Sequence, residues 1–163
     1  MPTPPFYNFR TILEEKITAY LSANITGVAI HKGITDEVRV IPIIICHAES
    51  SKAIDDLGSN TLGNYTATLK IFIYSSADDE TLDTHRARVV EVMGYLRDVE
   101  AIQSTFNPTS DGQLYDMWVL NDEEGMSQRR YGNALEYVVW GVLPTAPWHL
   151  AKTIWLTLKS ITV

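Results

Sequence analysis

The sequence predicts one α+β domain: a small mixed, mainly antiparallel sheet with two helices packed on it, followed by a C-terminal extension. Two segments show helical spacing of apolar residues, and the segments around them are β-branched or alternate like strands. The 163 residues suit a single domain, and 45% apolar with 20% charged residues is typical of a packed globular protein. We expect residues 1–145 to form the domain and residues 146–163 to be an apolar extension that contacts a neighbouring subunit.

Two helices are expected. The first is predicted to begin after Asn8 and to stop between Asn24 and Gly27. Its inner stripe comprises Phe9, Ile12, Leu13, Lys16, Ile17, Tyr20 and Leu21. The second is predicted to follow a strand directly, with Ser76 and Asp78 as candidate N-caps. Its apolar face comprises Leu82, His85, Val89, Val92, Met93, Leu96 and Val99. Its solvent-exposed side comprises Arg86, Arg88, Glu91 and Arg97.

Three segments before the second helix have strand signals. Val28–His31 predicts a short strand, and Val38–Ala48 is a β-branched run that we expect to be buried on both faces. Pro42 in that run indicates an edge position or a bulge. Residues 49–64 predict a loop. Tyr65–Ser75 alternates and is the clearest strand pattern in the chain.

The second half of the chain predicts a hairpin. Leu114–Leu120 alternates as one strand, Asn121–Gly125 is expected to be an acidic turn, and Met126–Leu143 returns as a long extended segment. Gly132 and Asn133 are expected to interrupt or bend the returning arm. The extension that follows has one apolar stripe, made of Leu150, Ile154, Trp155, Leu158 and Ile161.

Charge and composition exclude several classes of function. The net charge is −7, since the chain has 20 acidic residues and only 13 basic ones, which are scattered along it. Non-specific nucleic-acid binding is therefore not expected. No segment approaches the roughly 18 apolar residues of a membrane span, and no targeting signal is visible, so we expect a soluble protein without a membrane partner. Cys46 is the only cysteine, which excludes an internal disulfide and a Cys-rich zinc site.

Each candidate for chemistry also has a structural explanation. Cys46 and His47 are neighbours on a predicted strand, so their side chains point to opposite faces rather than pairing as nucleophile and base. The histidines lack zinc-type spacing; they are His31, His47, His85 and His149. Asp78-Asp79-Glu80 suits a helix start and Asp122-Glu123-Glu124 an exposed turn. We therefore expect no enzyme, no metal and no cofactor; a small metal-dependent hydrolase using Asp78, Asp79 or Glu123 remains the alternative.

Three features point instead to contacts between subunits. Arg129, Arg130 and Tyr131 combine two arginines with an aromatic residue, and these residue types are enriched in protein interfaces. The extension adds large apolar side chains, among them Trp148 and Trp155. An exposed apolar segment of this kind is rare in monomers.

The order of elements resembles a known family. The residues that carry the resemblance are Leu69–Ser75, then Asp83–Val90, then Arg130–Val139, within residues 8–145. This layout resembles the tail terminator, or tail-completion, proteins of long-tailed bacteriophages, including the lambda-like minor tail proteins of that role. The segment after Pro144 departs from the family layout.

The resemblance implies a structural role. Subunits of that family assemble as a hexameric ring that caps the tail tube, stops its polymerisation and presents a face to the neck or head-completion protein. The implied location is the tail–neck junction of the virion, reached from the host cytoplasm. Asp122, Glu123 and Glu124 would then face a lumen through which DNA passes without specific binding. A head-closure or neck adaptor protein is the alternative that shares these features.

Overall fold

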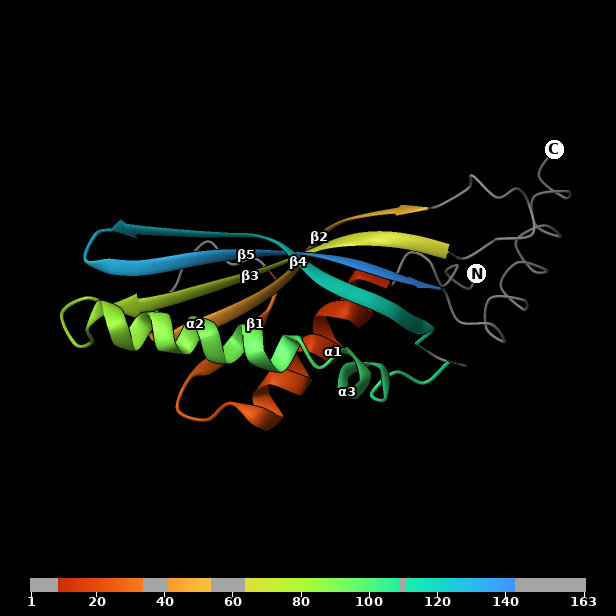
Figure 1. The fold of residues 1–163 in the computed structure, drawn as a ribbon, viewed down its shortest axis with the longest axis horizontal. Coiled ribbons are helices and arrows are strands. Elements are labelled where there is room, and N and C mark those ends of the chain that lie inside the picture. The colour runs from red at the N-terminus through yellow and green to blue at the C-terminus, as the bar shows by residue number, and fades with distance from the viewer. Residues whose placement is uncertain (1–8, 34–40, 54–63, 109–110, 143–163) are drawn as a thin grey trace, which may run out of the picture.

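In this computed structural model, a mixed sheet is covered on one face by helices (Figure 1). The structure describes residues 9–33, 41–53, 64–108 and 111–142. In chain order the elements are α1 (Phe9–Asn24), β1 (Ala29–Lys32), β2 (Ile43–Ala53), β3 (Asn64–Ser76), α2 (Leu82–Leu96), α3 (Val99–Gln103), β4 (Gln113–Ser127) and β5 (Arg130–Val142). The predicted α+β class is confirmed, with α3 as a short additional helix. None of the described helices is long and apolar enough to span a membrane.

The sheet has the order β1-β2-β3-β5-β4. Only the pairing of β1 with β2 is parallel among the described strands, and the other neighbours pair antiparallel. The long strands β3 and β5 form the centre, paired without interruption from Asn64↔Val142 to Ser76↔Arg130. The two edges differ, because β1 has 4 residues and β4 has 15.

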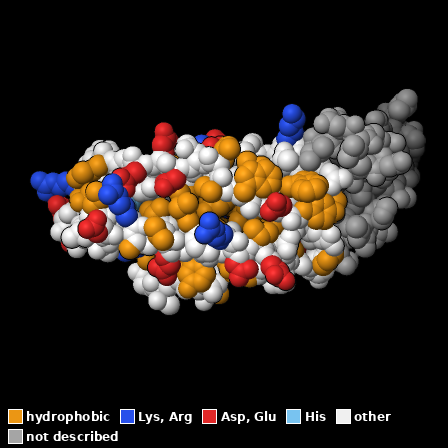
Figure 2. All heavy atoms as spheres, in the orientation of Figure 1, with side chains coloured by type: hydrophobic (Ala, Val, Ile, Leu, Met, Phe, Trp, Pro, Cys, Tyr) orange, Lys and Arg blue, Asp and Glu red, His pale blue; other side chains and the backbone are white. Residues whose placement is uncertain are grey.

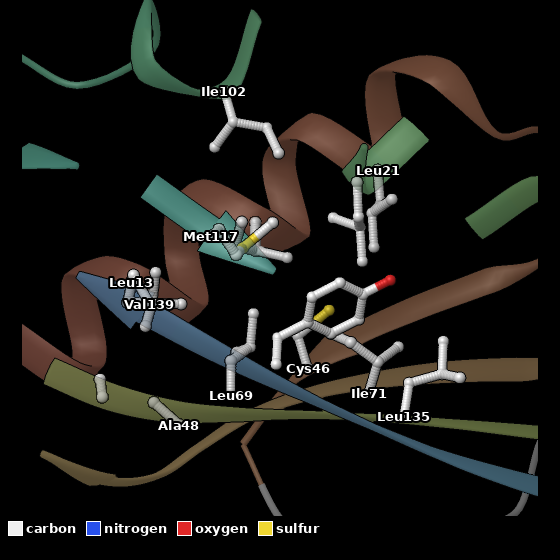
Figure 3. Close-up of a cluster of buried hydrophobic side chains, with 14 of the residues drawn as sticks. Leu13, Leu21, Cys46, Ala48, Leu69, Ile71, Ile102, Met117, Leu135 and Val139 are labelled. Atoms are coloured by element: carbon white, nitrogen blue, oxygen red, sulfur yellow. The ribbon is translucent and has the colours of Figure 1, made fainter. Parts of the chain in front are cut away.

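The core lies between the sheet and the helices. In β3 the predicted alternation is confirmed, since one side of the strand is buried from Tyr65 to Ser75 while the other is half-buried. The helix α1 contributes four buried side chains: Phe9, Leu13, Ile17 and Leu21. Figure 3 shows Leu13 and Leu21 of α1 above Cys46, Ile71 and Leu135 of three successive strands. Each such side chain contributes about 1.5–3 kcal/mol when fully buried.

The strand β2 corrects two predictions. It begins at Ile43 and extends to Ala53, so residues 49–53 of the predicted loop are strand. Pro42 comes directly before the first strand residue, where its missing N–H removes no bond of the strand. The strand is also internal, between β1 and β3, and its irregularity lies at Ala48/Ser50 rather than at the proline.

The start of α2 also differs from the prediction. Ser76 still belongs to β3, because it pairs with Arg130, and a turn separates it from the helix. The N-cap is Thr81, whose hydroxyl oxygen accepts a hydrogen bond from the backbone N–H of Thr84. Neither Ser76 nor Asp78 caps the helix. Arg88, which was predicted on the solvent-exposed side of the helix, is half-buried.

The hairpin turn lies further along the chain than predicted. Asn121–Gly125 is part of β4, and the turn is formed by Gln128 and Arg129, with φ angles of 51° and 61°. The long β3 explains the shift, because its pairing with β5 continues to Arg130 and β4 must match that length. The pairing of β5 with β3 is uninterrupted, so Gly132 and Asn133 do not break that arm. The predicted extension, residues 146–163, lies outside the described residues.

Gly141 provides a test of this packing. A Cβ at position 141 would overlap the Tyr65 hydroxyl oxygen and lie 2.5 Å from the Gln113 carbonyl oxygen. We expect Gly141→Ala to lower the free energy of unfolding by about 1–3 kcal/mol, measured by urea denaturation. Gly125→Ala is the control, because a Cβ there meets nothing within 4 Å. Equal losses in the two variants would contradict the close approach at Gly141.

Candidate functional site

The strand β4 is the most exposed element of the sheet. Only its pairing with β5 engages a described strand, so its outer edge has no described strand beside it. Two backbone groups of β4 are bonded to side chains instead: the Tyr115 carbonyl accepts from Gln103 Nε2, and the Met117 N–H donates to Asp116 Oδ1, each at 2.8 Å. Several large apolar side chains along it are exposed: Tyr115, Trp118, Val119, Leu120 and Met126. A long edge strand with exposed apolar residues is a surface on which another chain can pair or pack.

A groove of about 450 Å³ runs between β4 and α2. Its walls are mainly apolar and are formed by Val90, Met93, Gly94, Leu96, Arg97, Met117, Trp118, Val119 and Tyr137. Val90 on the helix side is 67% exposed. Hydrophobic side chains are visible between charged ones on the molecular face in Figure 2. The groove and the outer edge of β4 together form the candidate site, which we call the β4 surface.

A buried histidine fixes α2 to the sheet near this surface. His85 is fully buried, as predicted for a packed histidine. Its Nδ1 lies 2.7 Å from Ser75 Oγ on β3, and its Nε2 lies 2.6 Å from Asn133 Oδ1 on β5. One side chain of α2 is therefore hydrogen-bonded to both central strands.

The neighbours of these groups assign the direction of each hydrogen bond. Arg88 Nη1 donates to Ser75 Oγ over 2.6 Å, because a guanidinium can only donate. The Ser75 hydroxyl proton is then directed to His85 Nδ1. Asn133 Nδ2 donates to Asp122 Oδ1 at 2.7 Å, which leaves Asn133 Oδ1 to accept from His85 Nε2–H. Every polar atom in this sequence of contacts has a matching partner.

One ion pair ends this network at Glu80, and a second lies beside it at the surface. Arg88 makes two hydrogen bonds to Glu80, of 2.7 and 2.8 Å, and these hold the pKa of Glu80 below its usual range. On the exposed side, Arg86 donates to both carboxylate oxygens of Glu124 on β4, each at 2.8 Å. These hydrogen bonds lower the pKa of Glu124. The contacts connect α2 with β4 and so hold the two walls of the groove together.

The predicted acidic cluster is divided by the strand. Asp122 and Glu124 point to the helix side, where they meet Asn133 and Arg86. Glu123 lies between them on β4, and successive strand residues point to opposite faces. The three carboxylates therefore do not form one acidic turn. No group of three metal-ligating side chains is found among the residues that the structure describes.

The predicted basic segment is at the hairpin tip. The Arg129 side chain is 79% exposed and its Nη1 lies 3.9 Å from Asp78 Oδ2. Arg130 begins β5 and is half-buried, and the Tyr131 ring is tilted against His85 at a centroid distance of 5.7 Å. Trp148 and Trp155 lie outside the described residues. Of the three predicted interface residues that the structure describes, Arg129 is the one that the fold places fully at the surface.

The Cys46 thiol is enclosed in the core. Its side chain is fully buried, and this burial raises the pKa of the thiol to about 12. A thiol in that state is a poor nucleophile at neutral pH. His47 is half-buried, and its Nδ1 lies 3.9 Å from Glu14 Oε1.

Most of the β4 surface and the network beneath it are not predictable from the sequence. Ser75 and Asn133 are ordinary strand residues in the sequence, and their roles appear only when β3 and β5 are paired. The position of His85 on the inner face of a helix was the one signal of the network. The groove gave no signal, because its walls are 20 or more residues apart in the chain.

The fold has a counterpart among solved structures. It is similar to a chain of a structure described as "Virion of native gene transfer agent (GTA) particle", with a TM-score of 0.55 and 13% sequence identity. The similarity covers 80% of this chain and 94% of that chain. At this identity the likeness concerns the fold. No protein-family model matches the chain, and no curated protein matches it by sequence.

Removing the Ser75 hydroxyl tests the network. We expect Ser75→Ala to lower the free energy of unfolding by about 1–3 kcal/mol, because it leaves a buried acceptor on His85 without a partner. Chemical denaturation measures the change. Ser76→Ala is a matched control on the same strand, since Ser76 Oγ is reached only by the exposed Asp78 N–H, at 3.3 Å. A Ser76 variant as unstable as the Ser75 variant would contradict the assignment.

The Glu80–Arg88 pair predicts a pH dependence. Because Arg88 lowers the pKa of folded Glu80, ionised Glu80 stabilises the fold above the ordinary carboxyl pKa. This stability is lost as the pH falls from about 4.3 through the lowered pKa. We therefore expect wild type to be more stable than Glu80→Gln at pH 7, with a difference that shrinks in acid. A constant difference across a pH series of denaturation curves would contradict this role.

Proposed function

We propose that the chain is a structural protein of a phage-like virion. It forms a hexameric ring at the head-proximal end of a tail, ends polymerisation of the tail tube and joins the tail to the neck. The observation that carries this proposal is the fold shared with a chain of the gene transfer agent virion, over 94% of that chain. The element order that resembles tail terminators in the sequence is the order of this fold.

The shape of the sheet suits a ring. A closed ring joins two different surfaces of each subunit, head to tail. One is the β4 surface, with its free edge and apolar groove. The other includes the hairpin tip with Arg129 and, in the sequence, the extension with Trp148 and Trp155. The two sheet edges are unlike in length, and a head-to-tail contact joins unlike surfaces of a subunit.

The charge suits a channel for DNA. The net charge is −7, so the chain has no excess of cations to hold phosphates. Of the three carboxylates Asp122, Glu123 and Glu124, Glu123 lies on the sheet face opposite the helices. In the proposed ring, this carboxylate faces the lumen. DNA then passes without binding. The partners are further copies of this chain, the tail tube protein and a neck protein.

Localisation in assembled particles tests the proposal. We expect cryo-electron microscopy of particles that carry a tagged copy of this chain to show it as a ring between the tail tube and the neck. Contact with the tube subunit supports a terminator, whereas contact with the portal assigns the chain to a neck adaptor. A position outside a ring would contradict both roles. Deleting the gene is expected to give tails of uncontrolled length.

A further inference from the structure

We infer that the groove between α2 and β4 binds the C-terminal extension, residues 146–163, of a neighbouring copy of this chain. The inference rests on the proposed ring and names the contact that joins its subunits. Three observations support it: the exposure of the groove, a glycine in the wall of α2, and the composition of the extension.

The groove has apolar walls that the described residues leave open. Val90 is the most exposed of the large apolar residues that the structure describes, at 67%, and Val119 across the groove is 43% exposed. Met93 and Met117 also line the groove. Methionine adapts its shape to different partners and is common in surfaces that bind apolar segments. The groove therefore fits an apolar chain segment.

Gly94 lies in the helical wall of this groove. A glycine inside a helix lowers stability relative to alanine, and a Cβ at this position would meet nothing within 4 Å. Packing within the described part of the chain therefore does not account for the glycine. A missing side chain on a groove wall allows the backbone of a bound segment to approach closely.

The extension has the composition that the groove requires. It contains two lysines and no acidic residue, and its large apolar residues are Trp148, Leu150, Ile154, Trp155, Leu156, Leu158, Ile161 and Val163. The chain as a whole carries −7, so the rest of it is strongly acidic. Of the described residues that line the groove, Arg97 is the charged one, and Asp122 is close enough to the lining residue Tyr137 to act on it electrostatically. The extension and the groove therefore match in their apolar character, and a basic extension suits an otherwise acidic chain.

The direction of β5 favours a neighbouring copy over the same chain. The strand ends at Val142, paired with Gln113, and the groove lies behind that end beside Tyr137. The chain's own extension would have to reverse to reach it. The 18 residues of the extension reach up to about 60 Å when extended, enough to cross to another subunit.

Photo-cross-linking tests this contact in the assembled protein. Trp155→p-benzoylphenylalanine places a photoreactive aromatic group in the extension of the full chain. Isotopically heavy and light chains are mixed, assembled, irradiated and digested with trypsin. We expect heavy–light cross-links between position 155 and the α2 peptide 89–97 or the adjoining part of β4. Cross-links that join only chains of the same isotope would show the extension in its own groove and overturn the inference.

Imaging the same samples separates this inference from the proposed function. Rings without cross-links to the groove would overturn the contact and leave the ring in place. Heavy–light cross-links in assemblies that are not rings would support the contact and contradict the ring.

Three variants show whether the groove itself is responsible. Val90→Lys is expected to lower the cross-link yield about tenfold, because it removes an apolar contact and repels a basic segment. Met126→Lys is the matched control, because Met126 is 63% exposed on β4 but lies outside the groove, and it should keep the wild-type yield. Gly94→Ala is expected to raise the melting temperature by about 2 °C yet lower the yield. An unchanged yield in Val90→Lys or Gly94→Ala would overturn the inference.

Discussion

The hydrogen bonds of His85 determine how the helical layer sits on the sheet. The ring is fully buried and is bonded at one nitrogen to β3 and at the other to β5. Apolar contacts alone allow a helix to slide on a sheet, since they have little directionality. Two directed bonds from one ring allow a single position of α2. Two ion pairs lie beside this contact: Arg88 binds Glu80, and Arg86 binds Glu124 on β4. The position of α2 relative to β4, and with it the shape of the groove, therefore depends on a buried polar contact.

The length of β3 is the second constraint. Its thirteen paired residues set the length of β5, and β5 in turn sets where the hairpin turn lies. The turn therefore falls on Gln128 and Arg129, although neither residue favours a positive φ. Asn121–Gly125 is the better turn sequence, yet a turn there would place β4 beside the start of β5 and leave the C-terminal part of β5 without its β4 partner. Pairing along the strand outweighs the local preference of a few residues.

This competition between strand pairing and local sequence preference explains which parts of the fold could be predicted. The helix α1 and the strand β3 were predicted closely, because their apolar periodicity is strong and local. The hairpin turn, the end of β2 and the cap of α2 were misplaced, because pairing over long sequence distances decided them. The burial of His85 was foreseeable from its helix face. Its partners were not, because Ser75 and Asn133 meet only through the register of β3 with β5.

The unusual features of this chain gather on one hairpin. β4 exposes a long edge and large apolar side chains, and the adjoining turn holds two non-glycine residues in the left-handed region. Each feature lowers the stability or solubility of an isolated subunit. The rest of the fold is arranged to keep them in place, through the continuous β3–β5 pairing on one side and the Arg86–Glu124 pair on the other. Such costs are consistent with a surface that is covered in an assembly, where the edge is protected and the apolar groove is filled.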